Sequence, residues 1–205
     1  MIKVGLTGGY ATGKSFVASE LERLGCCLIY ADRLGHQVLK PEGEAYGPTV
    51  EAFGREILGS DGRIDRKKLG AIVFGAPALL EKLTGFVHPA VFRLEEQMLA
   101  DCQAQNTSGI AVMEAAILIE TGRYKIFDRI ILTVCREETQ IQRGMKRDGL
   151  TAEQARQRIE QQMTAEEKTA YADYVVDTSG DKQDTIRRVQ LIYQDLQALV
   201  HAKQT

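Results

Sequence analysis

The sequence predicts an α/β fold, namely a five-stranded, parallel, doubly wound sheet with a helical insertion and a helical lid. Short apolar runs alternate with segments of helical periodicity, which is typical of a parallel sheet. A glycine-rich turn, Gly8–Ser15, joins the first apolar run to the first helical segment. Residues 32–105 show several helical signals and no clear strand. We therefore expect one sheet whose chain is interrupted by a helical insertion.

Strands are expected where apolar runs are short and end in turn residues, at 2–6, 26–30, 110–113, 130–134 and 174–176. Between them, glycine and proline mark the ends of helices. Gly25 is expected to end a helix over 17–24, and Lys40–Gly43 to divide residues 33–54 into two helices. Pro77 is expected to open a helix, and His88-Pro89 to precede a separate, longer one.

The remaining helices are expected at residues 69–74, 137–147, 152–162, 165–171 and 186–200. Two of them begin with capping boxes, because Thr151 is followed by Gln154 and Thr164 by Glu167 at the required spacing. The last helix carries apolar residues at an amphipathic period.

The composition is that of an ordinary globular chain. Of 205 residues, 44% are hydrophobic and 26% charged, and the net charge of −2 gives no support for a nucleic-acid partner. No apolar run approaches the roughly 20 residues of a membrane span. The N-terminus enters a strand, so we expect no signal peptide. These features predict a cytoplasmic protein without a membrane partner.

The four cysteines are Cys26, Cys27, Cys102 and Cys135, and their spacing matches no metal-binding motif. Three of them fall in or beside apolar segments. We therefore expect buried thiols in a reducing cytoplasm, in preference to disulfides or metal ligands.

Gly8–Ser15 fits the phosphate-loop pattern G-x-x-x-x-G-K-[ST] at every fixed position. Its glycines let backbone N–H groups and the positive end of a helix dipole face a phosphate chain. Lys14 is expected on the β- and γ-phosphates, and Ser15 as a ligand of Mg²⁺. Nucleotide contacts are expected from Gly8, Gly9, Ala11, Thr12, Gly13, Lys14, Ser15 and Phe16. By analogy with other phosphate-loop proteins, we expect strand one at the centre of the sheet.

A phosphate loop indicates a nucleoside triphosphate but does not say how it is used. Three classes compete: a small-molecule kinase, a GTPase switch and an ATP-driven mechanical protein. Asp32–Gly35 fits the D-x-x-G of GTPases, but it follows Lys14 too soon to leave room for a switch segment. Asp181–Asp184 lacks the leading Asn of N-K-x-D. The GTPase interpretation is therefore disfavoured.

A kinase must exclude water during transfer, and it does so with a lid that brings arginines to the phosphates. Arg143, Arg147, Arg156 and Arg158 lie in and around the polar helices between the fourth and fifth strands. Arg143 and Arg147 are four positions apart and share a helix face, so together they can line a polyanion site. We interpret Arg156 as an ordinary surface residue.

Asp32 follows the second strand directly. It can be the N-cap of the next helix, or it can lie at the sheet edge where α/β proteins bind ligands, and the two roles are compatible. In a kinase, it is the early carboxylate placed to accept the proton of the attacking hydroxyl.

The chain also resembles a known family, the dephospho-coenzyme A kinases. The stretches that carry the resemblance are Gly5–Gly9 with Gly13–Ser15, Ala31-Asp32, Phe53-Gly54, Asp61-Gly62 with Asp65-Arg66, Val73-Phe74, His88-Pro89, Leu118 with Glu120, Gln142-Arg143 with Arg147, Arg158 with Gln161, and Ala172-Asp173 with Val176-Asp177. The resemblance implies the P-loop kinase fold. It also implies ATP- and Mg²⁺-dependent phosphorylation of the ribose 3′-hydroxyl of dephospho-coenzyme A, the last step of coenzyme A synthesis. A related kinase of the nucleoside monophosphate or shikimate type is the alternative.

The resemblance implies roles for individual residues. Asp32 looks like the general base, and Lys14 like the catalytic lysine that contacts the phosphates. Arg147 looks like the lid arginine, and Arg143 is expected among the nucleotide contacts. The acceptor site is expected from Asp32, Arg66, His88, Leu118 and Glu120. For His88, a helix-start histidine packed against Pro89 is an equally good interpretation.

The chain departs from the family pattern in five segments. Phe16 replaces a usual Thr, Tyr10 a usual aliphatic residue, and Tyr30 the first Asp of D-A-D. The P-L-L segment reads Ala116–Leu118, and the D-N near the last strand reads Asp177-Thr178, which leaves the adenine contacts open.

The resemblance also implies three parts. We expect residues 1–31, 106–140 and 172–205 to form the nucleotide-binding core, 32–105 the acceptor-binding insertion and 141–171 the lid. The expected partner is the small-molecule acceptor, and the expected assembly is a monomer or a weak homo-oligomer.

Overall fold

A computed structural model of the chain describes residues 1–105 and 108–203. The chain divides into two compact units. The first consists of Met1–Tyr30 with Asp101–Thr205, and the second of Ala31–Ala100. The predicted core segments 106–140 and 172–205 include residues 106–107 and 204–205, which lie outside the described residues.

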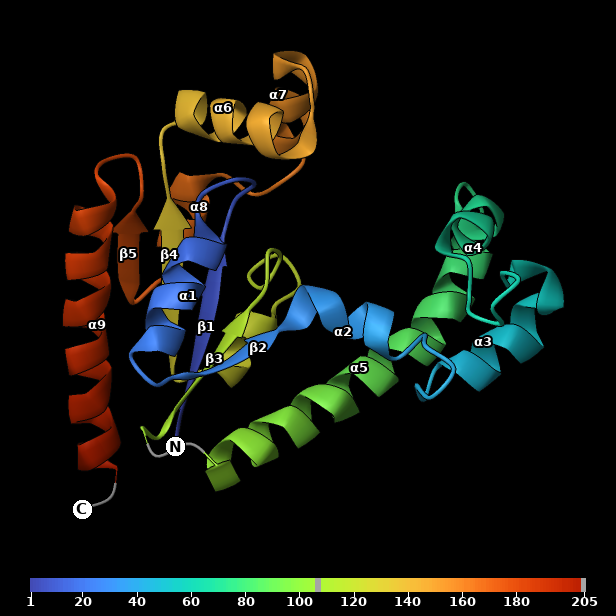
Figure 1. Ribbon diagram of the computed structural model, residues 1–205, viewed down its shortest axis with the longest axis horizontal. Helices are drawn as coiled ribbons and strands as arrows, with labels where there is room; N and C mark the ends of the chain where they lie inside the picture. Colours follow the sequence, from blue (N-terminus) through green and yellow to red (C-terminus); the bar gives the residue numbers. More distant parts are fainter. Residues whose placement is uncertain (106–107, 204–205) are drawn as a thin grey trace. The chain divides into compact units, whose positions relative to one another are not determined.

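The first unit is built on a five-stranded sheet in which every neighbouring pair of strands is parallel. The strands are β1 (Ile2–Gly8), β2 (Cys27–Tyr30), β3 (Ile110–Glu114), β4 (Arg129–Val134) and β5 (Tyr174–Asp177). Their order is β2-β3-β1-β4-β5, with β1 in the middle (Figure 1). The predicted strands and the central place of the first one are confirmed. All five carboxyl ends therefore point to one edge, where α/β proteins bind ligands.

The helices of the first unit are α1 (Lys14–Arg23), η2 (Arg123–Ile126), α6 (Glu137–Asp148), α7 (Ala152–Glu160), α8 (Ala165–Thr169) and α9 (Lys182–Ala202). The capping boxes at Thr151 and Thr164 are both formed, so the predicted starts of α7 and α8 are confirmed. Gly25 follows the end of α1 with a φ of 97°, a left-handed conformation that suits glycine.

The apolar core lies on both faces of the sheet. On one face, α1 and α9 pack against β1, and Val4, Leu6, Leu21 and Leu196 are fully buried there (Figure 1). Full burial of one such side chain contributes about 1.5–3 kcal/mol. On the other face, Gly5 leaves room for neighbouring side chains, since a Cβ built at Gly5 would lie 2.5 Å from Leu118 Cδ2.

The second unit is helical. It contains α2 (Ala31–Gln37), α3 (Tyr46–Phe53), η1 (Arg55–Ile57), α4 (Arg66–Val73) and most of α5 (Pro77–Gln105). Phe53, Ile57, Leu69 and Val73 form one buried cluster, and Val38, Ala45 and Ala90 form another. The predicted break between α2 and α3 is confirmed, because residues 38–45 form turns.

The separate helix predicted after His88-Pro89 is wrong. A single helix, α5, runs from Pro77 to Gln105 with Pro89 inside it. An interior proline costs about 3 kcal/mol because it removes one N–H and crowds the preceding turn. Burial of Ala90, Leu99 and Cys102 on the same helix offsets this cost.

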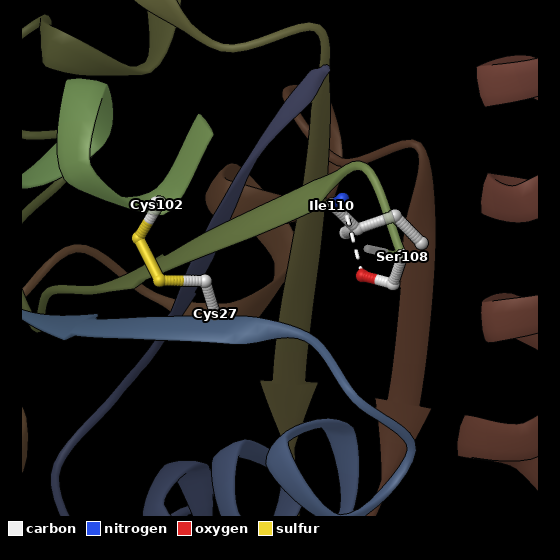
Figure 2. The surroundings of a disulfide bond; sticks show 4 residues. All are labelled: Cys27, Cys102, Ser108 and Ile110. Atoms are coloured by element: carbon white, nitrogen blue, oxygen red, sulfur yellow. Dashed lines mark hydrogen bonds between the residues drawn. A yellow bond between two sulfur atoms is a disulfide. The ribbon is translucent and has the colours of Figure 1, made fainter. Parts of the chain in front are cut away.

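The expectation that all four cysteines are thiols is also wrong. Cys27 in β2 and Cys102 near the end of α5 form a disulfide whose Cα atoms are 5.8 Å apart (Figure 2). The same view shows the Ser108 hydroxyl, which accepts a hydrogen bond from the N–H of Ile110 at the start of β3. Cys26 and Cys135 are free thiols, the first buried and the second half-buried.

Within residues 1–105 and 108–203, no helix combines the length and the apolar character needed to cross a bilayer. Over the same residues, no three His, Cys, Asp or Glu side chains gather into a metal site. A metal held by a hydroxyl and by substrate phosphates does not require such a cluster.

Candidate active site

The phosphate loop joins the end of β1 to the start of α1, as its chemistry requires. Gly13 is the N-cap of α1 and has a left-handed backbone with φ 87°. Among the described residues, no side chain caps this helix. The N–H groups at the start of a helix point along its axis, so this end of α1 offers hydrogen bonds and a partial positive charge to an anion.

Gly8 and Gly13 are required by close packing around the loop. A Cβ at Gly8 would lie 2.2 Å from the Thr133 hydroxyl, and one at Gly13 would lie 3.1 Å from the Thr178 hydroxyl. Ala11 also has a left-handed backbone, with φ 55°, which is uncommon for a residue other than glycine. Backbone strain of this kind concentrates at functional sites.

Lys14 and Ser15 lie at the mouth of the loop. Lys14 Nζ donates hydrogen bonds to the carbonyl oxygens of Gly8 and Gly9, at 2.8 and 3.0 Å. Ser15 is exposed, and its hydroxyl donates to Glu114 Oε1 at 3.4 Å. Glu114 ends β3, beside β1, and its residue is 8% exposed. Sequence reasoning missed Glu114, although a carboxylate at the end of a buried strand is a recognisable signal.

A chain of hydrogen bonds ties the loop to β4, β5 and α6. The hydroxyls of Thr12 and Thr133 are 2.8 Å apart, and the Thr178 hydroxyl donates to the carbonyl of Thr12 at 2.8 Å. Arg143 then donates to the hydroxyl and the carbonyl of Thr178, at 2.9 and 2.7 Å. The structure therefore gives Thr178, a departure from the family pattern, a direct link to the loop.

Two cavities flank the loop within the first unit. One, of about 200 Å³, is lined by Gly13, Phe16, Arg143, Thr178, Gly180, Lys182 and Thr185. The Lys182 ammonium lies 5.7 Å from the centre of the Phe16 ring. The other cavity, of about 480 Å³, lies beside Gly9 and Tyr10 and reaches α7 and α8. Cavities of this size accommodate parts of a small ligand.

Arg147 and Arg158 meet at Tyr10. The Arg147 guanidinium lies 5.1 Å from the centre of the Tyr10 ring, and that of Arg158 lies 5.4 Å from it. Both arginines form ion pairs with Asp148, and Tyr10 donates its hydroxyl hydrogen to the same carboxylate. These hydrogen bonds, first from Arg147 and then from Tyr10, hold the pKa of Asp148 well below its usual range. The structure thus separates Arg143 from Arg147, since their guanidinium groups bind different partners.

Arg156 pairs with Glu137 and Glu153 and is 45% exposed, which agrees with its interpretation as a surface residue.

In the second unit, Asp32 lies in the first turn of α2. Because α2 begins at Ala31, Asp32 is not its N-cap, and that interpretation is wrong. His36 follows one turn later. Burial lowers the pKa of His36, the positive charge of Arg66 lowers it further, and Asp32 opposes both. Asp32, His36 and Arg66 therefore lie near one another in the second unit, and the sequence did not single out His36.

The other predicted acceptor residues are spread over both units. His88 is exposed within α5, where its ring centre lies 6.1 Å from that of Phe92, so it does not start a helix. In the first unit, Leu118 is 2% exposed and packs over Gly5.

Glu120 lies in the first unit and forms an ion pair with Lys168 at 2.7 Å. The Lys168 side chain is 1% exposed, and within the described residues its ammonium forms the ion pair without a hydrogen bond of good geometry. Without the Glu120 carboxylate, the buried Lys168 ammonium would be an unpaired charge that destabilises the fold.

The family model for dephospho-CoA kinase matches residues 2–184. The chain belongs to the dephospho-CoA kinase family. The dephospho-CoA kinase of Geobacter sulfurreducens is 41% identical over 93% of this chain and 96% of its own. The dephospho-CoA kinase of Campylobacter jejuni, a solved structure, has a TM-score of 0.64 at 25% identity and covers 94% of this chain, over 96% of its own. A protein from Thermus thermophilus reaches a TM-score of 0.80 at 28% identity over 95% of this chain and 97% of its own.

Membership of the family confirms the resemblance, the P-loop kinase fold and the reaction class, a phosphotransferase of coenzyme A synthesis. As a kinase family, it implies the use of ATP. A relative at 41% identity is a dephospho-CoA kinase, so the alternative of a nucleoside monophosphate or shikimate kinase is not supported.

Proposed function

We propose that this chain transfers the γ-phosphoryl group of ATP to the ribose 3′-hydroxyl of dephospho-CoA. The hydroxyl oxygen attacks the γ-phosphorus, the bond from that phosphorus to the β–γ bridging oxygen breaks, and CoA and ADP form. The observation that carries the proposal is an intact phosphate loop, Gly8–Ser15, in a chain that matches dephospho-CoA kinases over nearly the full length of both.

The phosphate chain binds to the loop and to the first turn of α1. Nucleotide contacts come from Gly8, Gly9, Ala11, Thr12, Gly13, Lys14, Ser15, Phe16, Arg143 and Arg147. Lys14 exchanges its loop carbonyls for β- and γ-phosphate oxygens. The adenine occupies the cavity between Phe16 and Thr178, where the planar guanidinium of Arg143 is suited to stack on a base.

The Ser15 hydroxyl would hold Mg²⁺ together with phosphate oxygens of the nucleotide, and the metal would supply positive charge that offsets the negative charge developing during transfer. The neighbouring Glu114 carboxylate, 3.4 Å from the Ser15 hydroxyl, places negative charge where a divalent cation is favoured.

The acceptor is bound by Asp32, Arg66, His88, Leu118 and Glu120. Asp32 accepts the proton of the 3′-hydroxyl and releases it to solvent. Arg147 stabilises the charge of the transferring group and belongs to a lid of residues 141–171. Residues 32–105 bind the acceptor, and residues 1–31, 106–140 and 172–205 bind the nucleotide. Positioning and electrostatics supply most of the rate, and the base a smaller share.

The protein works as a monomer or a weak homo-oligomer in the cytoplasm, where ATP is available, and binds neither nucleic acid nor membrane. Cytoplasmic thiols can reduce the Cys27–Cys102 disulfide, so the proposed activity should be measured for both the oxidised and the reduced protein.

The test is an ADP-release assay with a panel of acceptors: dephospho-CoA, AMP, shikimate and no acceptor. Dephospho-CoA should raise ADP release far above the acceptor-free rate, whereas AMP and shikimate should not. The substrate assignment is wrong if dephospho-CoA gives no more ADP than water and another acceptor does.

Asp32→Asn tests the base. The change keeps the size of the side chain and removes its basicity, so turnover should fall about 100-fold or more while the KM for ATP stays close to that of the wild type. Asp195→Asn, an exposed change on α9, is the matched control and should leave turnover unchanged. Near-normal turnover of Asp32→Asn removes Asp32 from the role of base.

A further inference from the structure

Tyr10 connects the phosphate loop to the helices that carry the lid arginines. It stands in the middle of the loop, at a position where the family pattern usually has an aliphatic residue. Its backbone N–H donates to Gln162 Oε1 at 2.7 Å, just beyond α7. Its side chain reaches the end of α6, 138 positions away in the sequence, where the hydroxyl hydrogen bonds to Asp148. One residue thus joins the loop to the end of α6 and to the segment that follows α7.

The Tyr10 ring lies directly against α6 because residue 144 is glycine. A Cβ built at Gly144 would lie 2.6 Å from Tyr10 Cε1 and 2.8 Å from its hydroxyl oxygen. Real Cβ atoms do not approach other atoms so closely, and packed interiors have no spare room for one. Only glycine at position 144 therefore permits this placement of the ring.

The ring face is where the lid arginines gather. The guanidinium groups of Arg147 and Arg158 lie 5.1 and 5.4 Å from the ring centre, within the range of a cation–π contact. Both groups bind Asp148, with Arg147 Nε and its terminal nitrogen at 2.8 and 2.9 Å from the carboxylate oxygens. A forked guanidinium binds a carboxylate and a phosphate with the same geometry. The Asp148 carboxylate therefore accepts the same hydrogen bonds from these arginines that phosphate oxygens can accept.

We propose that Tyr10 is a positioning residue that holds Arg147 and Arg158 at the phosphate loop. The inference rests on the role proposed above for Arg147. The ring supplies a platform that both cations keep while their hydrogen bonds pass from Asp148 to the γ-phosphate. The Tyr10 hydroxyl retains the Asp148 carboxylate when the arginines leave it. The side chains of Arg147 and Arg158 are 59% and 50% exposed, so a phosphate can reach both.

The first experiment compares Tyr10→Leu with Tyr10→Phe and measures kcat, the KM for ATP, and ADP released without acceptor. Two exposed cation–π contacts correspond to about a 5- to 30-fold change in the population of placed arginines. Tyr10→Leu should therefore lower kcat for transfer about 5- to 30-fold, with the KM for ATP changed by less than about 3-fold. Tyr10→Phe keeps the ring and should lose about 2-fold at most.

Tyr193→Leu is the control for the loss of a half-buried tyrosine, since Tyr193 lies on α9 and packs in the core. It should lower the melting temperature without changing kcat. A double-mutant cycle adds the specific readout: in an Arg147→Ala, Arg158→Ala background, Tyr10→Leu should no longer lower kcat.

Gly144→Ala gives a second route that leaves the phosphate loop intact. The added methyl group displaces the ring, so kcat should fall as in Tyr10→Leu, although alanine stabilises a helix relative to glycine. In the Tyr10→Leu background, where no aromatic ring faces position 144, the Gly144→Ala change should have no further effect.

The outcomes separate this inference from the proposed function. If the wild type shows no turnover of dephospho-CoA, the proposed function fails. If the wild type is active and Arg147→Ala is also active, the role of Arg147 fails. If both hold and Tyr10→Leu or Gly144→Ala keeps the kcat of the wild type, the Tyr10 inference alone is overturned. Equal losses in Tyr10→Phe and Tyr10→Leu overturn it as well, since the ring is then not the platform.

Discussion

Reduction of the Cys27–Cys102 disulfide should destabilise the protein by several kcal/mol. The disulfide joins residues separated by 75 positions, and it restricts the unfolded chain accordingly. For a loop of this length, the chain-entropy relation gives about 15 cal/mol/K, or about 4.5 kcal/mol at 25 °C. Residual structure in the unfolded chain reduces this value, so we expect a loss of about 2–4.5 kcal/mol.

The position of the disulfide gives it a further importance. Cys27 precedes the boundary of the units at Tyr30, and Cys102 follows the boundary at Asp101. The bond therefore links the two segments through which the chain leaves the first unit and returns to it. Its first cysteine, Cys27, lies five positions before Asp32, the proposed base.

The assay is urea unfolding of the full chain with and without dithiothreitol. Wild type and Cys135→Ser should both lose stability on reduction, because Cys135 is a free thiol. Cys102→Ser should unfold at the midpoint of the reduced wild type and should not respond to the reductant.

Thiols must be counted in denaturant, because burial raises the pKa of Cys26 to about 12 and leaves that thiol unreactive in the native state. Protein that has not met a reductant should then show the two free thiols, Cys26 and Cys135, of its four cysteines. Four reactive thiols, or an equal response of Cys102→Ser to reduction, would refute the reasoning.

Two further predictions concern contacts that the sequence did not reveal, namely the hydrogen bonds of Thr178 and the ion pair of Glu120 with Lys168. Thr178→Val keeps the shape of the side chain but removes its hydrogen bonds to Thr12 and Arg143, so the KM for ATP should rise about 5- to 20-fold in steady-state assays; Thr169→Val, on the exposed surface of α8, is the control, and an unchanged KM contradicts the adenine placement. Glu120→Gln leaves the buried Lys168 ammonium without its carboxylate and should cost about 3–5 kcal/mol in urea unfolding, with a higher KM for dephospho-CoA; a higher KM for ATP alone would contradict the placement of Glu120 at the acceptor.

The strands and the phosphate loop could be predicted because their signals are local. A buried parallel strand is a continuous apolar run, as in Ile130–Val134, and the loop motif has fixed spacing. Capping boxes are also local, since Thr151 and Gln154 are within one turn. Each of these features is decided by residues that are neighbours in the sequence.

The errors and omissions concern contacts between distant residues. The prediction of a helix break at Pro89 rests on the low helix propensity of proline. Packing of other residues on α5 offsets this preference, and the helix continues through Pro89. The disulfide depends on the pairing of β2 with the end of α5, which no spacing of cysteines reveals. Glu114 becomes a neighbour of Ser15 only when β3 pairs with β1.

Two of the departures from the family pattern, Tyr10 and Thr178, have a common consequence. Thr178 links Arg143 to the loop through the Thr12 carbonyl, and Tyr10 links Arg147 to the loop through its ring. Arg143 and Arg147 are four positions apart, so they lie about one turn apart on α6. The loop therefore contacts successive turns of the same helix through residues that are unusual for the family. Because the arginines are already ordered, less conformational entropy remains to be lost when the phosphates bind. If Arg143 and Arg147 have the roles proposed above, we expect these departures to strengthen the coupling between nucleotide and lid instead of weakening the nucleotide site.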